Sequence, residues 1–142
     1  MIHATMDALQ REWEILHGDH ERYERLALGI KLTAVVLSLA CLALGVDAIP
    51  AMLFMLVLWL QEGIWKTFQA RTGARILSIE KLMQTPNRDE GAAFQLYTTW
   101  ETSKRGAVDL IQEYFSNALR PTVAYPYAVL TLLLLLFSVS EA

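Results

Sequence analysis

Three apolar blocks dominate the sequence, and each is long enough to need a lipid environment. They cover residues 26–46, 49–65 and 123–139. The first has Lys31 as its only charged residue, and the second has no polar residue before Gln61. A helix needs about twenty mostly apolar residues to span the hydrocarbon core of a bilayer, whereas a helix on the core of a soluble protein usually keeps a polar face. The sequence therefore predicts an all-α membrane protein with three transmembrane helices.

The composition agrees with this interpretation. Hydrophobic residues make up 54% of the 142-residue chain, against about 45–50% in soluble domains. The net charge of −3 gives no reason to expect nucleic acid as a partner. The single cysteine, Cys41, lies inside the first block, so we expect neither a disulfide framework nor a thiolate metal cluster. A mostly polar segment precedes the first block and no small-residue cleavage site follows it, so we expect no cleavable signal peptide.

The first two blocks are joined by a very short connection. Only Asp47 and Ala48 separate them, and Pro50 is acceptable in the first turn of the second helix. Two helices joined in this way must be antiparallel neighbours. We therefore predict a transmembrane hairpin over residues 26–65.

The positive charges predict the orientation. All twelve Lys and Arg residues lie before or at the start of the first block, or between the second and third. Because cytoplasmic segments are enriched in Lys and Arg, we expect a multi-pass protein of the inner (cytoplasmic) membrane, with its N-terminus in the cytoplasm and its C-terminus outside. We also expect seven residues near the block ends to act as membrane-interface anchors: Lys31, Trp59, Trp65, Lys66, Arg120, Tyr125 and Tyr127.

Residues 1–25 form an amphipathic arm with a heptad-like pattern. Its seam residues alternate at spacings of three and four, which is typical of a coiled coil or of a helix packed along another helix. The seam consists of Met6, Leu9, Trp13, Leu16, His20 and Tyr23. Two interpretations stay open: the seam packs on the protein's own cytoplasmic helices, or it joins copies of the chain. A helix lying flat on lipid is less favoured, because the opposite face is acidic as well as basic.

Residues 66–121 are expected to complete a small cytoplasmic helical bundle. No helix breaker follows the second block until Pro86, which predicts one long helix over about 49–84 that projects as a stalk. A turn at 85–88 follows, with a capping pattern formed by Asn87 and Glu90.

Two shorter helices are expected between this turn and the third span. The first lies around residues 93–100, with a short strand over 94–102 as the alternative. The second carries an apolar face made of Val108, Ile111, Phe115 and Leu119. Residues 122–142 then form the third span and a short outer tail.

The polar residues give little indication of chemistry. His17, His20 and Glu21 form the only local cluster of metal-ligand types, and metal sites in helical bundles need such pairs on several facing helices. Glu62 and Lys66 are one helical turn apart at the membrane boundary, which predicts an ion pair. No charged residue lies near the centre of a block, which argues against a proton-coupled transporter. We therefore expect no enzyme activity, no cofactor and no metal.

The layout of arm, tight hairpin and long cytoplasmic helix resembles that of the bacterial SLATT-type membrane proteins. The resemblance covers residues 10–84 and includes the stretch from Trp59 to Lys66, which leads into Arg75, Ile76 and Glu80. It implies an oligomeric membrane effector or pore that responds to cytoplasmic signals. The third span is an addition to that layout.

Two functions are consistent with these features. The first is a homo-oligomer that acts as a pore, channel or signalling effector and is assembled through its cytoplasmic helices. The second is an accessory or assembly subunit of a larger membrane complex. In both cases the lipid bilayer is a partner.

The role of the seam can be tested by substitution. If the seam joins copies, polar replacements of Leu9, Trp13 and Leu16 should dissociate the oligomer, as measured by the mass of the purified protein in mild detergent. If the copies stay together, the seam is intramolecular.

Overall fold

The chain folds into helices in the computed structural model, which describes residues 2–85, 91–102 and 106–140. The helices are α1 (Ile2–Ala43), α2 (Ala48–Gln84), α3 (Leu96–Thr102), α4 (Ala107–Ala118) and α5 (Pro121–Ser140). No strand occurs among the described residues, which confirms the all-α prediction. The alternative of a strand over 94–102 is wrong, because residues 96–102 form α3. The predicted capping pattern of Asn87 and Glu90 lies outside the described residues.

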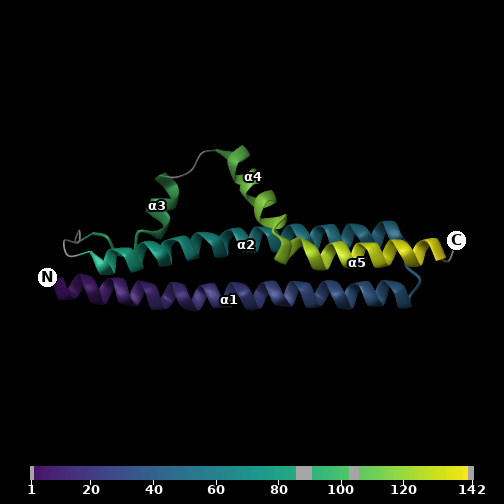
Figure 1. Cartoon of the computed structure of the whole chain (residues 1–142), viewed down its shortest axis with the longest axis horizontal. Helices are drawn as coiled ribbons and strands as arrows, with labels where there is room; N and C mark the ends of the chain where they lie inside the picture. Colours follow the sequence, from purple (N-terminus) through teal and green to yellow (C-terminus); the bar gives the residue numbers. More distant parts are fainter. Residues whose placement is uncertain (1, 86–90, 103–105, 141–142) are drawn as a thin grey trace.

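The two longest helices form an antiparallel hairpin, and α5 lies beside the end of it that contains the short connection (Figure 1). At that connection Gly45 has a φ of +64°. Such left-handed backbone conformations favour glycine. The amide of Val46 then donates to the carbonyl of Cys41 at 2.9 Å, and that of Gly45 donates to Leu42 at 3.4 Å. These two bonds satisfy carbonyls at the end of α1, which explains how so short a link can reverse the chain.

Three helices, α1, α2 and α5, are long and apolar enough to cross a membrane. They pack around a small core made of Ala34, Cys41, Ala51, Met55, Tyr127 and Leu134. Many other apolar side chains of these segments are exposed in the single chain, as expected of surfaces that face lipid or another transmembrane helix.

The opposite halves of α1 and α2 form a second apolar core. Leu9 and Leu16 of the arm are buried against Ile76 and Ile79 of the stalk. Trp13 packs at the edge of this core. The other seam residues, Met6, His20 and Tyr23, are partly buried. This packing favours the intramolecular interpretation of the seam.

Helix α4 reaches α2 at a point where only glycine fits. A Cβ atom at Gly63 would lie 2.7 Å from the Cβ of Ala118 and 3.3 Å from the carbonyl oxygen of Tyr114. The first distance is far shorter than ordinary van der Waals contact, and the second is tight. Gly63 therefore permits the close approach of the two helices. At Gly73 the nearest atom, Cε1 of His20, would be 3.4 Å away.

This difference predicts opposite effects for two matched substitutions in α2. Replacing a helical glycine by alanine favours the helix by up to about 1 kcal/mol, and Gly73→Ala should show that gain. Gly63→Ala should instead lower the unfolding temperature, because α4 must move away. The measurement is thermal unfolding in nanodiscs, followed by circular dichroism. Equal stabilities for the two variants would contradict a close approach at Gly63.

Candidate functional site at the polar end of the spans

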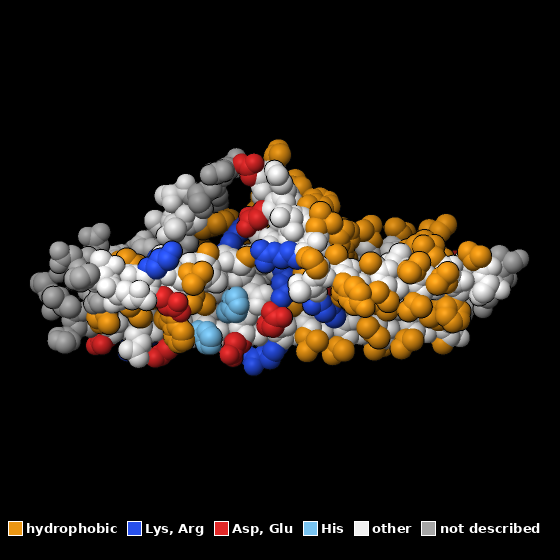
Figure 2. Space-filling model, in the orientation of Figure 1, with side chains coloured by type: hydrophobic (Ala, Val, Ile, Leu, Met, Phe, Trp, Pro, Cys, Tyr) orange, Lys and Arg blue, Asp and Glu red, His pale blue; other side chains and the backbone are white. Residues whose placement is uncertain are grey.

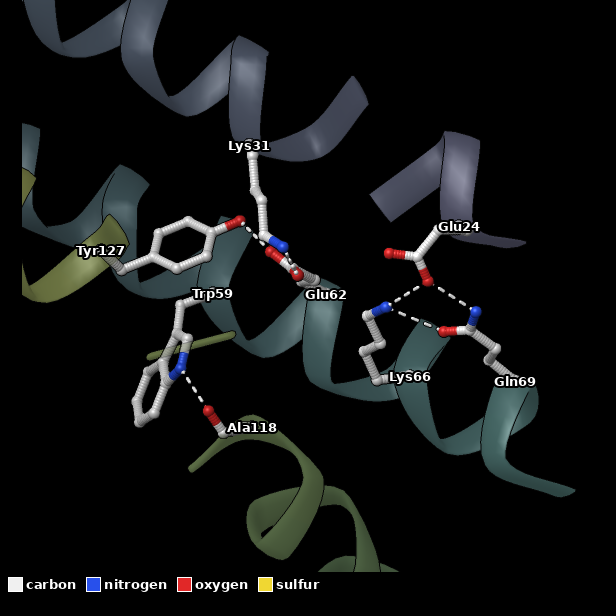
Figure 3. A network of polar contacts seen from close by, with 8 residues as sticks. All are labelled: Glu24, Lys31, Trp59, Glu62, Lys66, Gln69, Ala118 and Tyr127. Atoms are coloured by element: carbon white, nitrogen blue, oxygen red, sulfur yellow. Dashed lines mark hydrogen bonds and ion pairs between the residues drawn. The ribbon is translucent and has the colours of Figure 1, made fainter. Parts of the chain in front are cut away.

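One buried carboxylate connects all three apolar helices. Glu62 of α2 is 0% exposed. The Nζ atom of Lys31, from α1, lies 3.0 Å from Glu62 Oε1, and the hydroxyl of Tyr127, from α5, donates to Oε2 at 2.9 Å. Figure 3 shows both side chains pointing toward the carboxylate from their separate helices. We call Lys31, Glu62 and Tyr127 the span triad.

The span triad overturns one sequence-based expectation. Glu62 and Lys66 do not pair with each other: Glu62 contacts Lys31 and Tyr127, while Lys66 contacts residues 24 and 69. A carboxylate that is buried must be neutralised by a partner that is held in place. Lys31, on the facing helix α1, is that partner. Lys66 lies one helical turn farther along α2, where it bonds other side chains.

A second polar cluster lies next to the triad on the arm side. Lys66 donates to Glu24 at 2.7 Å and to the side-chain oxygen of Gln69 at 2.8 Å. Gln69 also donates to Glu24, at 2.6 Å. Glu24 precedes the first apolar block, and its hydrogen bonds with Lys66 and Gln69 hold the pKa of its carboxyl group below the ordinary value. His20 lies beside this cluster, with its Nε2 atom 3.4 Å from Gln69.

A third ion pair holds the far end of the arm. Arg75 and Glu12 are both buried and make two hydrogen bonds, at 2.9 and 3.0 Å. Arg75 also donates to the carbonyl of Ala92 at 2.7 Å, and the amide of Phe94 donates to Glu12 at 2.6 Å. Phe94 has a φ of +59°, an uncommon conformation for a bulky residue. The pair therefore pins the segment before α3 against α1 and α2.

Sequence reasoning missed this buried pair, although a signal was present. Glu12 follows Leu9 by three residues and precedes Leu16 by four, so it lies on the seam face of α1. A charged residue at such a position indicates a buried partner.

Polar contacts also attach α4 to α2. The indole of Trp59 donates to the carbonyl of Ala118 at 2.9 Å, as Figure 3 shows. Asn117 donates to the hydroxyl of Thr67 at 2.9 Å. Arg71 pairs with Glu113 at 2.8 Å. These bonds fix the rotation of α4 about its own axis.

The predicted interface anchors fall into three groups. Lys31, Trp59, Lys66 and Tyr127 take part in the polar contacts described above. Trp65 is half-buried, with its ring 5.6 Å from that of Tyr23. Arg120 and Tyr125 are exposed. Their role at a membrane interface stays a prediction.

His17 of the arm makes an aromatic contact and a polar contact with its neighbours. His17 stacks on Trp13, with ring centroids 4.8 Å apart, and lies 3.5 Å from Glu21. Within the described ranges, no group of three or more His, Cys, Asp or Glu residues is arranged to hold a metal ion. A series of ion pairs joins the spans, the arm, the stalk and α4 to one another.

Comparison with protein families, with curated proteins and with solved structures finds no match to this chain.

The span triad can be tested by a double-mutant cycle. Lys31→Met leaves the buried charge of Glu62 without a partner, which typically costs about 3–5 kcal/mol. Glu62→Gln removes that charge, so the double variant should recover most of the lost stability. Unfolding in nanodiscs, followed by circular dichroism, measures both. The matched control is Lys81→Met, at an exposed position of α2. If Lys31→Met is as stable as this control, the triad does not stabilise the fold.

Proposed function

We propose that this chain is a non-enzymatic inner-membrane protein that assembles from copies of itself and acts as a signalling effector or pore. In this proposal its N-terminus and the cytoplasmic helices lie on the inner side, and its C-terminus lies outside. The cytoplasmic helices receive the signal, and the spans carry out the response.

The observation that supports assembly is an apolar groove between α2 and α5. Its volume is about 610 Å³. Its walls include Ile49, Met52, Leu56, Ala124, Ala128 and Thr131. Helices within a membrane associate by close packing at small residues, and Ala124, Ala128 and Thr131 are spaced to lie on one face of α5. We assign the groove to a transmembrane helix from a second copy.

The packing of the arm changes the expected assembly surface. Leu9 and Leu16 are buried against the stalk of the same chain, which favours assembly through another surface than the seam. The spans therefore supply the contact in this proposal. The interior between the three spans is filled by Ala34, Met55 and Leu134, so any pore would form between copies rather than within one.

The span triad supports a role in signalling. It connects α5 to the hairpin at the end where α1 and α2 continue into the arm and stalk. A displacement of the arm would therefore act directly on the packing of the spans. Such coupling needs an element with two packing arrangements, and a buried ion pair whose partners come from separate helices is suited to that role.

An accessory subunit of a larger complex is the second candidate. The observation that favours it is the exposure of two aromatic side chains near α3, Phe94 at 60% and Tyr97 at 79%. Exposed aromatic residues are enriched at protein–protein interfaces. Under this alternative, α3 would contact a cytoplasmic partner.

The mass of the protein in nanodiscs separates the two candidates. We expect one defined oligomer for the natural chain. Ala128→Trp fills the groove and should give monomers. Leu136→Trp places the same side chain on an exposed part of α5 outside the groove, and this control should remain oligomeric. A natural chain that is monomeric, or that purifies only with other proteins, would contradict self-assembly.

Ion flux across liposomes then distinguishes a pore from a scaffold. Flux from the natural chain that is lost in Ala128→Trp and kept in Leu136→Trp would support a pore between copies. An oligomer without flux would leave signalling as the function.

A further inference from the structure

Helix α4 has an apolar face that the other described residues leave uncovered. Val108, Ile111, Phe115 and Leu119 are spaced at three to four residues, so they form one stripe along the helix. Their exposed fractions lie between 49% and 77%. Four large apolar side chains in a continuous row are too many to be a scattered surface feature. The stripe therefore indicates a binding surface.

The position of α4 along the molecule indicates what kind of partner its apolar stripe contacts. Its C-terminal end packs at Gly63 and accepts a hydrogen bond from Trp59, one turn or less from Glu62 in the span triad. Two residues separate α4 from α5, which starts at Pro121. In Figure 1, α4 leaves the bundle at the start of α5 and runs across its long axis, whereas α1, α2 and α5 run along it. The helix thus emerges where the spans end and extends sideways.

The rotation of α4 turns the stripe away from α2. On the opposite side, Glu113 pairs with Arg71 and Asn117 bonds Thr67. Because α4 cannot rotate about its own axis without breaking these contacts, its apolar residues stay turned away from α2. Figure 2 shows hydrophobic side chains on the flank of α4 that faces the spans, continuous with the apolar surface of the spans themselves.

We propose that α4 is an interfacial membrane helix that rests on the cytoplasmic surface of the bilayer, with its apolar stripe inserted at the boundary of headgroups and acyl chains. Helices of this kind combine an apolar face with a polar face and lie in the plane of the interface. The polar residues Asp109, Gln112 and Ser116 are exposed and lie next to the stripe, where they would face headgroups and water. In the sequence, Lys104 and Arg105 precede the helix and Arg120 follows it, which suits an anionic leaflet.

Lipid is favoured over a protein partner because the stripe is continuous with the surface of the spans. Leu119, which lies between α4 and α5 in the chain, is itself 64% exposed. A chain that spans the bilayer has lipid at this level in any case. The inference depends on the membrane-spanning helices and not on the assembly of copies.

Site-directed spin labelling of the full chain in nanodiscs of phosphatidylcholine and phosphatidylglycerol tests this inference. Cys41 is first replaced by Ala, and single cysteines are introduced at Ile111 and Phe115 in the stripe. Ser116→Cys and Asp109→Cys are the matched positions on the polar side. Accessibility is measured to oxygen, which concentrates among acyl chains, and to a water-soluble nickel chelate.

We expect oxygen to dominate by several-fold at Ile111 and Phe115, and nickel to dominate at Ser116 and Asp109. Equal access of nickel to all four positions would place the stripe in water and overturn the inference. Protection of Ile111 and Phe115 from both reagents would also overturn it, because a protein would then cover the stripe. Repeating the measurement with Ala128→Trp separates this inference from self-assembly. The oxygen preference should persist in that variant even if the copies dissociate.

Discussion

The three apolar helices meet at one buried carboxylate, which Lys31 and Tyr127 contact from α1 and α5. Glu62 has no access to solvent, and a carboxylate in such a place is tolerated only when a positive group and hydrogen-bond donors surround it. Lys31 and Tyr127 meet this requirement from two other helices. The triad therefore fixes the rotation of α1, α2 and α5 about their own axes, and it fixes their positions along those axes relative to one another. Apolar packing between helices in lipid gives less specificity of this kind, since lipid tails are as apolar as the side chains they replace.

The same principle recurs along the hairpin. Glu12 pairs with Arg75, Glu24 with Lys66, and Lys31 with Glu62. As the residue number of the α1 partner rises from pair to pair, that of the α2 partner falls. This is the order that two antiparallel helices require. The outermost pair is buried and the middle pair is partly exposed, so they contribute unequally. Exposed ion pairs add little stability, whereas breaking a buried one leaves a charge without a partner. The register of the hairpin is therefore set mainly by the first and third of these pairs, whose carboxylates are buried.

One side of helix α4 makes polar contacts with α2, and its opposite side is apolar. Its contacts with Thr67 and Arg71 hold it to the stalk, and Gly63 allows it to come close. The other side is apolar, and no other described residue covers it. The sequence pattern showed that Ile111 and Phe115 share a face, but it did not show which surroundings that face meets. That depends on the direction in which α4 leaves the bundle.

The helices, the three apolar segments and the tight reversal at Asp47 could all be predicted from the amino-acid sequence. These features follow from local rules: the length of an apolar run, the spacing of side chains along a helix and the shortness of a link. The sequence also indicated that the arm packs along another helix, although not on which one. The partners of the charged side chains could not be predicted in this way, because they depend on how the folded helices are arranged. Glu62 and Lys66 satisfy the spacing rule for a pair within one helix, yet each bonds side chains from α1 instead. The physical reason is that burial, not spacing, selects the partner of a charge, and burial depends on how separate helices are rotated and brought together.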